Sequence, residues 1–408
     1  MMEREEKKNS DLPEGWETEP FVNTIEKFKA ERIKQIQANA YLSNGKYPII
    51  DQGQELIAGW SNDKFAIIKD GLPLIIFGDH TRIFKYIDFP FAIGADGTKL
   101  IKPQSRFDAR YFYYYLLILD IQSKGYSRHY KILKENNVNY PPLPEQEKIA
   151  AILYKIQQAI EAQDEIIKKT MDLKKSTMQF LFTRGIYGEK TKQTEIGEMP
   201  ESWRVIKLEQ IASIERGKFT HRPRNDPSYY GGGTPFIQTG DITRSNGRIR
   251  TFYQTLNERG LSVSKIFPTG TILITIAANI GDTGILEFDS AFPDSIIGLT
   301  PFKGISNEYL EYYLRTQKYQ MNESAPKGTQ KNINIEFLKP WPIKLPSYNE
   351  QKEIATILWK IDQKIELAER KKQTLNNLFQ SMLNQLMTGK IRVGNINFIG
   401  LDNEEIQR

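Results

Sequence analysis

Three short segments in the second half of the chain concentrate side chains that bind phosphates and base edges. Lys and Arg neutralise phosphates, while Arg, Asn and Gln can form paired hydrogen bonds with bases in a DNA groove. Such residue types on loops favour nucleic-acid recognition over catalysis. The predicted contact residues, in chain order, are Arg216, Lys218, His221, Arg222, Arg224, Arg244, Asn246, Arg248, Lys327, Gln330 and Lys331.

The first half of the chain carries a thinner set of the same residue types. His80 and Arg82 lie in one short polar segment, and Arg128, His129 and Lys131 lie in another. For any one of the segments in either half, a solvated loop is the favoured interpretation. Because the pattern recurs in both halves of the chain, we predict that each half contacts DNA.

Several kinds of catalytic or metal chemistry have no support in the sequence. The chain has no cysteine and only three histidines, so thiol chemistry and Cys-type zinc sites are excluded and a His-rich metal site is not expected. The run from Gly185 to Thr191 fails the spacing of a phosphate-binding loop, and no dinucleotide fingerprint follows a strand pattern. We therefore expect no cofactor, no metal and no catalytic site in this chain, although an enzyme with an unrecognised site stays open.

Length and composition indicate a multidomain globular protein. The 408 residues are 39% hydrophobic and carry a formal net charge of +6, and a chain of this length typically forms two to four domains. The mild positive charge is compatible with a nucleic-acid partner. The first residues lack an apolar signal-peptide core, and no stretch approaches about 18 uncharged apolar residues. We expect a cytoplasmic protein without a membrane span.

The chain repeats itself. Residues 145–161 read EQEKIAAILYKIQQAIE, and residues 350–366 read EQKEIATILWKIDQKIE. Extended without a gap to Thr183 and Thr388, the alignment has 15 identities in 39 positions. Upstream of each copy, a Pro-Glu-x-Trp segment ends at Trp16 and at Trp203. The chain therefore reads as two tandem halves, each with a globular stretch followed by a repeated segment.

The repeated segment predicts a long amphipathic helix in each half, because its apolar residues recur at steps of three and four. Two such rods in one chain most simply cover each other as a coiled coil, and we favour an antiparallel pair with the domains at opposite ends. A parallel pair, or helices that each pack on their own domain, are the alternatives. The predicted pairing residues are Ile149, Ile152, Leu153, Ile156 and Ile160, and Ile354, Ile357, Leu358, Ile361 and Ile365.

The two globular stretches predict mixed α+β domains, since short β-type runs are broken by Gly, Pro, Asn and Asp, and a short amphipathic helix follows near residues 110–119 and 307–319. The fold class is thus α+β, with two mixed domains and two paired long helices in a pseudo-two-fold tandem repeat. The predicted boundaries are 1–143 for the first domain, 144–184 for the first helix, 185–198 for a polar linker, 199–345 for the second domain, 346–390 for the second helix and 391–408 for a tail.

Two variable domains, each followed by such a helix motif, resemble the specificity subunit of type I restriction–modification systems. The motif residues are Leu143-Pro144-Glu145-Gln146 through Leu153, and Leu345-Pro346 with Glu350-Gln351 through Leu358, where two extra residues precede Glu350. Thr234-Pro235, Gly240-Asp241-Ile242 and Gly281-Asp282-Thr283-Gly284 also resemble the family, whereas the first domain matches only in part. The resemblance covers the chain from Leu12 to about Val393.

The resemblance implies that each domain is a target recognition domain that reads half of a divided DNA site. It implies that the paired helices set the spacer and dock two methyltransferase subunits, which methylate adenine N6 using S-adenosylmethionine. It further implies that restriction subunits, a translocase and nuclease, join the complex, and that this chain is itself not an enzyme. The alternative from the residues alone is a stand-alone architectural DNA-binding or coiled-coil scaffold protein.

Overall fold

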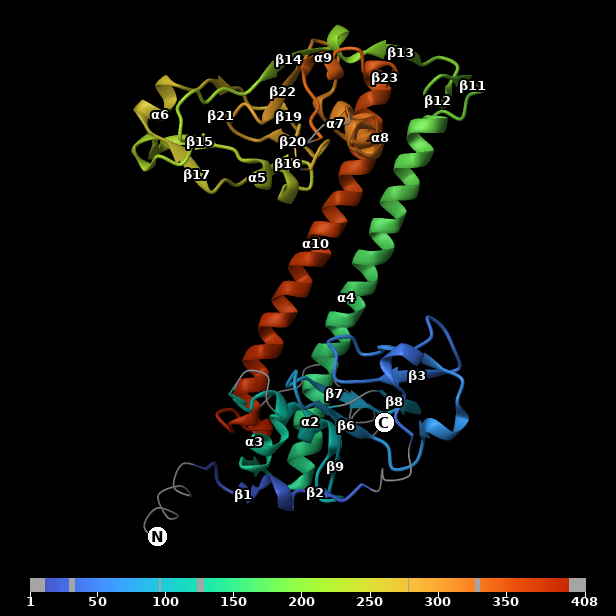
Figure 1. Ribbon diagram of the computed structural model, residues 1–408, viewed down its shortest axis with the longest axis vertical. Coiled ribbons are helices and arrows are strands. Elements are labelled where there is room, and N and C mark those ends of the chain that lie inside the picture. Colours follow the sequence, from blue (N-terminus) through green and yellow to red (C-terminus); the bar gives the residue numbers. More distant parts are fainter. Residues whose placement is uncertain are drawn as a thin grey trace. The chain divides into compact units, whose positions relative to one another are not determined.

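The computed structural model describes residues 12–28, 34–94, 97–122, 128–277, 279–326 and 331–395 (Figure 1). The chain divides into two compact units. Unit 1 extends to Glu165 and resumes at Glu369, and unit 2 comprises Ile166–Ala368. Because the two long helices each run from one unit into the other, every unit contains one part of each helix.

Unit 1 is a mixed α+β unit built on three small sheets. Their strand orders are β1-β10, β2-β9-β6-β7 and β4-β3-β8-β5. The strands are β1 (Glu17–Pro20), β2 (Ile25–Glu26), β3 (Tyr47–Ile50), β4 (Gly59–Ser61), β5 (Ile67–Ile68), β6 (Leu74–Gly78), β7 (Phe84–Ile87), β8 (Phe91–Ile93), β9 (Thr98–Pro103) and β10 (Asn137–Tyr140). The helices are α2 (Ala109–Leu117), α3 (Tyr130–Lys134) and the first part of α4 (Leu143–Arg184).

Unit 2 has the same class of architecture with larger sheets, ordered β14-β22-β19-β20-β16 and β17-β15-β21-β18, and the two-stranded sheets β11-β12 and β13-β23. The strands are β11 (Thr191–Thr194), β12 (Gly197–Pro200), β13 (Arg204–Lys207), β14 (Ala212–Arg216), β15 (Tyr230–Phe236), β16 (Arg248–Ile249), β17 (Gln254–Leu256), β18 (Ile266–Phe267), β19 (Ile272–Thr275), β20 (Thr283–Leu286), β21 (Ser290–Ala291), β22 (Ile296–Pro301) and β23 (Pro342–Leu345). The helices are the second part of α4, then α5 (Thr239–Arg244), α6 (Glu258–Ser262), α7 (Asn307–Thr316), α8 (Lys318–Ser324), α9 (Ile335–Leu338) and the first part of α10 (Tyr348–Met387), whose second part belongs to unit 1.

The two units share one plan around the start of each long helix. In unit 1 the strand after Trp16 pairs antiparallel with the strand before α4, and Glu17 lies opposite Tyr140. In unit 2 the strand after Trp203 pairs in the same way with the strand before α10, and Arg204 lies opposite Leu345. The prediction of two tandem mixed domains is confirmed at the level of strand pairing.

The long helices pack antiparallel, as the contacts inside each unit demonstrate. In unit 1, Ile149 and Leu153 near the start of α4 share a core with Leu383 and Leu386 near the end of α10. In unit 2, Leu181 and Phe182 near the end of α4 share a core with Ile354, Leu358, Ile361 and Ile365 from the first part of α10. The predicted antiparallel pairing is therefore confirmed, and the parallel alternative is excluded.

Ion pairs support the same direction. In unit 1, Asp164 of α4 pairs with Lys372 of α10 at 2.5 Å, and in unit 2, Lys174 of α4 pairs with Asp362 of α10 at 2.5 Å. Burial lowers the pKa of Lys174, and Arg315 contributes in the same direction, while Asp362 opposes both. The Lys174–Asp362 pair is largely buried, and removing one partner would leave the other charge poorly solvated, so this pair favours one register of the two helices.

Not every predicted pairing residue lies in a core. Ile152 packs at the edge of the unit 1 core, and Ile156 and Ile160 are half-buried. Ile357 is 36% exposed and lies outside the core that holds the other four residues of its set. Its role in helix pairing stays a prediction, because three- and four-residue spacing describes a face wider than the seam that the partner helix covers.

Each long helix begins and ends at a local signal. Pro144 follows the first residue of α4, and at the start of α10 the Ser347 hydroxyl accepts a 3.3 Å hydrogen bond from the backbone N–H of Glu350. Gly185 and Gly389, with φ of +64° and +66°, follow the helix ends in the left-handed conformation that glycine adopts at low cost. The Glu350 carboxylate does not return this contact to Ser347, because it accepts from Trp203 and Ile186 instead.

The segment predicted as a polar linker, 185–198, is structured. It contains β11 and the first half of β12, and the antiparallel pairing of these strands places Thr191 opposite Pro200. The buried ammonium of Lys344 donates to the Glu198 carbonyl at 2.7 Å and to the Phe182 carbonyl at the end of α4 at 3.1 Å. A cation at a helix C-terminus is favoured there, so the hairpin is fastened to the helix end rather than free. The predicted linker is therefore a structured hairpin.

The segment after α10 also belongs to a unit. Val393 is buried in the unit 1 core, and Arg392 binds both carboxylate oxygens of Glu145 at 2.8 Å. Residues 396–408 of the predicted tail lie outside the described residues. Within unit 1, therefore, residues from both ends of the described chain pack around the start of α4.

Candidate nucleic-acid interface

The loop after β14 carries the densest predicted cluster, and one carboxylate organises it. Arg222 contacts Asp294 Oδ2 at 3.1 Å, and Arg224 contacts the other oxygen of the same carboxylate. Arg216 donates from Nε to the Asp294 carbonyl. Arg222, Arg224 and Lys218 remain exposed. The loop thus presents several cations around a single acid, which is suited to an anionic partner.

His221 lies in the same loop with a defined orientation. Its ring stacks on Tyr229 with centroids 3.9 Å apart, and its Nε2 lies 3.1 Å from Asp226 Oδ2. The backbone N–H of Ser228 donates to the Asp226 carboxylate and, as the largest effect, lowers the pKa of that group. These contacts fix the direction of the imidazole, as a base-reading side chain requires.

The turn from α5 to β16 divides the predicted residues into two groups. The Arg244 side chain is 59% exposed, pairs with Asp241 at 3.0 Å and lies over the ring of Tyr253, 4.9 Å from its centroid. Asn246 is exposed and adopts a φ of +48°, a left-handed conformation that asparagine tolerates better than most residues. Arg244 and Asn246 therefore remain available for contact with a ligand.

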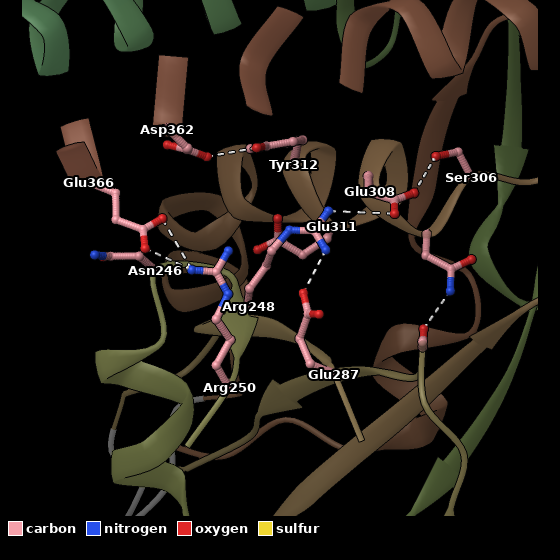
Figure 2. A network of polar contacts seen from close by, with 12 residues as sticks. Asn246, Arg248, Arg250, Glu287, Ser306, Glu308, Glu311, Tyr312, Asp362 and Glu366 are labelled. Atoms are coloured by element: carbon pink, nitrogen blue, oxygen red, sulfur yellow. Dashed lines mark hydrogen bonds and ion pairs between the residues drawn. The ribbon is translucent and has the colours of Figure 1, made fainter. Parts of the chain in front are cut away.

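Arg248, by contrast, lies in an internal network of ion pairs. It contacts Glu287 at 2.7 Å and Glu308 at 3.5 Å (Figure 2). Its neighbour Arg250 donates to both carboxylate oxygens of Glu366 on α10 at 3.1 Å. We correct the prediction that Arg248 contacts DNA: its guanidinium already bridges two acids, which come from distant parts of the sequence.

The third predicted segment of unit 2 is described only in part. Lys327 and Gln330 lie outside the described residues. Lys331 is exposed, and its ammonium donates to the Asn322 carbonyl at 3.3 Å. Lys331 thus stays a predicted contact, without a geometric argument of its own.

In unit 1 the structure brings two of the predicted residues together. His80 and Arg128 line a polar cavity of about 670 Å³ with Gln35, Asp79, Gly97, Thr98 and Lys99. Arg82 adopts a φ of +63°, and its side chain donates to the Ile121 carbonyl at 2.9 Å. Lys131 is exposed on the short helix α3. The candidate surface of unit 1 is thus centred on His80 and Arg128.

His129 is the other correction. It is 1% exposed, its Nδ1 lies 2.9 Å from the Asp79 carbonyl, and its backbone N–H donates to the same oxygen. The Asp79 carboxylate in turn accepts from the backbone N–H of Tyr130 at 2.8 Å. His129 therefore connects two segments inside the domain. A contact between its ring and DNA would require that its hydrogen bonds to the Asp79 carbonyl break.

Sequence reasoning missed several polar side chains that hold the domains on the long helices. Gln146 and Gln351, both 1% exposed, occupy equivalent positions in the two repeats. The tyrosines of α2 and α7 were seen only as amphipathic helices. Their shared Tyr-x-x-Tyr-Tyr spacing, at Tyr111 and at Tyr309, was the available signal.

The described part of the chain contains neither a metal-binding group of side chains nor a membrane-spanning helix. No group of three or more His, Cys, Asp or Glu side chains there is arranged to hold a metal ion. Among the same residues, no helix is both long and apolar enough to cross a membrane.

Comparisons with known proteins match both halves of the chain. The model of a family described as type I restriction modification DNA specificity domain matches residues 13–169 and 200–377. The type I restriction enzyme MjaVIII specificity subunit of Methanocaldococcus jannaschii is 29% identical over 417 residues, which cover 95% of each chain. The putative MjaX specificity subunit of the same organism is 31% identical over 265 residues, 64% of this chain, and that match spans only 60% of the relative.

Solved structures agree in fold. A type I restriction–modification S subunit from M. genitalium has a TM-score of 0.62 at 16% identity, covering 91% of this chain and 96% of its own. A structure from a study of assembly and conformational transition in a type I system has a TM-score of 0.56 at 17% identity, covering 93% and 99%. The tandem arrangement of mixed domains and long helices is therefore shared with these proteins.

Proposed function

The chain belongs to the family of type I restriction–modification DNA specificity subunits, and on that premise we propose that each of its mixed domains reads one half of a divided DNA sequence. The observation that carries this proposal is the double match of the family model, once to each half. The two domains share the strand pairing around the long helices but differ in their loops. Two domains that are attached to the long helices in the same way, but that carry different loops, are suited to recognise two different half-sites.

The candidate DNA contacts lie on exposed loops of both units. In unit 2 they are the cluster around Asp294 together with Arg244 and Asn246, and in unit 1 they surround His80 and Arg128. Arg and Asn side chains can read base edges in the major groove, whereas lysines contribute charge that is independent of sequence. The partner is double-stranded DNA, and the side chains of these loops determine which base sequence is recognised.

The antiparallel helices act as the spacer between the half-sites and as the docking surface for other subunits. Because the helix motif occurs twice, it offers two related surfaces, and we assign one methyltransferase subunit to each. Restriction subunits, which supply translocation and DNA cleavage, join the same assembly. Transfer of a methyl group from S-adenosylmethionine to adenine N6 belongs to the methyltransferase subunits, and this chain binds no cofactor of its own.

A domain exchange tests the proposal. The chain is produced with its methyltransferase subunit, and methylation is mapped on a DNA library that contains every half-site and spacer. We expect one bipartite motif. Replacing residues 199–345 with the corresponding domain of another specificity subunit is expected to change one half of the motif and leave the other half intact. A change in both halves contradicts independent reading.

The partner stoichiometry has its own test. Native mass measurement of the assembled complex is expected to give two methyltransferase subunits per chain. A stable one-to-one complex in the presence of excess methyltransferase contradicts that number. The stand-alone scaffold alternative is not favoured, and it would require sequence-independent DNA binding that the methyltransferase leaves unchanged.

A further inference from the structure

The helix that each domain packs against the long helices carries a matched trio of tyrosines. The trio is Tyr111, Tyr114 and Tyr115 in α2, and Tyr309, Tyr312 and Tyr313 in α7. All six side chains are at most 4% exposed. A buried tyrosine hydroxyl needs a hydrogen-bond partner, so the partners of these six groups reveal what the helices are attached to.

Two hydroxyls of each trio bind the strand that leads into the long helix. Tyr111 donates to the Asn139 carbonyl at 3.2 Å, and Tyr309 donates to the Lys344 carbonyl at 2.5 Å. The third tyrosine of each trio donates to the same strand, to the Asn137 carbonyl at 3.3 Å in unit 1 and to the Pro342 carbonyl at 3.4 Å in unit 2. These contacts hold the helix to its own domain.

The middle hydroxyl instead binds the long helix itself. Tyr114 donates to Gln157 Oε1 on α4 at 2.9 Å. Tyr312 donates to Asp362 Oδ2 on α10 at 2.7 Å (Figure 2). Residues 157 and 362 are aligned positions of the two repeats, so the same attachment is present in both units.

A second attachment lies at the start of the same domain helix. Gln146 Oε1 accepts from the backbone N–H of Asp108 at 3.1 Å, and Gln351 Oε1 accepts from that of Ser306 at 2.9 Å. Asp108 and Ser306 are the N-cap residues of α2 and α7. Each glutamine is also anchored at its other end, because its amide donates to the carbonyl of the proline five residues earlier.

Each domain helix also shares a hydrophobic core with its long helix, and two polar attachments restrict the orientation of the domain more than one attachment does. In each repeat, the glutamine and the middle-tyrosine acceptor are separated by eleven residues, which is close to three helical turns and about 16 Å. They therefore lie on one face of the long helix. The domain helix is held there at its N-cap and again about two turns further along its length.

The two units differ in the charge of the residue that accepts the hydrogen bond from the middle tyrosine. In unit 2, Asp362 also pairs with Lys174, and Arg250 binds Glu366 one turn along α10. In unit 1 the acceptor is the neutral Gln157, and Arg110 lies between the rings of Tyr154 and Tyr86 at 3.8 and 4.3 Å. The attachment is thus repeated although the surrounding side chains are not.

We propose that Gln146, Tyr114 and Gln157 in unit 1, and Gln351, Tyr312 and Asp362 in unit 2, are positioning residues that set the spacer. They form a two-point clamp that fixes the orientation of each recognition domain on its long helix. The length of the helices sets the preferred spacer between the half-sites. The clamps set how strongly this spacer is preferred over spacers that are one base pair longer or shorter. This inference rests on the proposed reading of two half-sites.

The test uses substitutions that remove single hydroxyls and keep the buried rings. The clamp variant combines Tyr114→Phe with Tyr312→Phe. The control variant combines Tyr111→Phe with Tyr309→Phe, which removes hydroxyls from the same helices but spares the contacts to α4 and α10. Both are assembled with the methyltransferase subunit, and methylation is sequenced on a library with the wild-type half-sites and every spacer length.

We expect the clamp variant to retain the sequence of both half-sites but to lose selectivity for the spacer. The preference for the best spacer over spacers one base pair longer or shorter should fall about two- to tenfold, the range for one hydrogen bond in each unit. The control variant should keep the wild-type spacer preference at a similar or lower thermal stability. The combined Gln146→Ala and Gln351→Ala variant should broaden the spacer in the same way.

The contrary outcomes are distinct. Wild-type selectivity in both the tyrosine clamp variant and the glutamine variant would overturn the clamp. Equal broadening in clamp and control variants would also overturn it, because general loosening would then be the cause. If the wild-type complex itself selects no bipartite motif, the proposed function fails, and the clamp loses its premise with it.

Discussion

The indole Nε1 of Trp203 donates a 2.9 Å hydrogen bond to Glu350 Oε2, and both side chains are buried. The two residues belong to the two repeated sequence elements, and in the second half this contact joins those elements. The other oxygen of Glu350 accepts from the backbone N–H of Ile186 at 3.2 Å. In unit 1 the equivalent carboxylate, Glu145, binds Arg392 instead. No hydrogen-bond partner of the buried Trp16 Nε1 was found in the described part of the chain.

The Glu350 contact predicts unequal effects of the same substitution in the two repeats. Glu350→Ala leaves a buried indole N–H and a backbone N–H without their acceptor, and should lower the free energy of unfolding by about 1–3 kcal/mol. Glu145→Ala removes a pair with the 36% exposed Arg392 side chain, and should cost about 1 kcal/mol or less. Urea unfolding followed by tryptophan fluorescence measures both, and equal losses would contradict the difference between the units.

Arg222 predicts a local change in DNA specificity. Arg222→Ala should cost about 1–3 kcal/mol of binding free energy and relax the preference at one base-pair position. Binding to variant half-sites at several salt concentrations measures both quantities. Lys360→Ala, which removes an exposed charge from α10, is the control. Uniform weakening with a salt slope lower by about one would identify a phosphate contact, and no change at all would remove the loop from the interface.

Arg248 and Arg244 predict opposite effects on DNA binding although they lie four residues apart. Arg248→Ala leaves Glu287 and Glu308 without their shared partner, but both carboxylates are partly exposed, so it should lower the free energy of unfolding of unit 2 by about 1 kcal/mol or less and leave the salt slope of DNA binding unchanged. Arg244→Ala should weaken DNA binding, because its side chain is mostly exposed. The buried Asp241 carboxylate loses this partner but keeps the backbone N–H of Gln238, so the free energy of unfolding should fall by about 1 kcal/mol. The reverse pattern would restore Arg248 as a DNA contact.

The long helices predict a change of spacer with helix length. Four residues added after Ala162 and four after Leu367 extend each helix by about 6 Å and nearly preserve the apolar face. At about 3.4 Å per base pair, the preferred spacer should grow by one or two base pairs in the methylation library. Two added residues rotate the face by about 200° and should disrupt pairing. A folded, active four-residue variant with the original spacer would show that the helices do not set it.

Local patterns in the sequence were sufficient to predict the two long helices and their ends. Their period, their start at Pro144 and Ser347, and the glycines after their ends depend on neighbours within a few residues, so they can be read without a fold. The repeat also indicated that the two helices pair, because two equal apolar faces in one chain can bury each other, and it favoured the antiparallel direction without excluding the parallel one. The α+β character of the domains followed from short β-type runs between turn residues.

What only the tertiary structure decided is which polar side chains are free. Arg244 and Arg248 are alike in sequence, but Glu287 and Glu308, which neutralise Arg248, lie 39 and 60 residues further along the chain. The sequence predicted His129 as a DNA contact, but its ring contacts the carbonyl of Asp79, which lies 50 residues earlier in the chain. The attachment of Tyr114 to Gln157 and of Tyr312 to Asp362 was equally hidden, because a hydrogen bond depends on distance in space and leaves no period in the sequence. Periodicity therefore determined the helices of this protein, whereas the sites depend on long-range pairing that only the folded chain establishes.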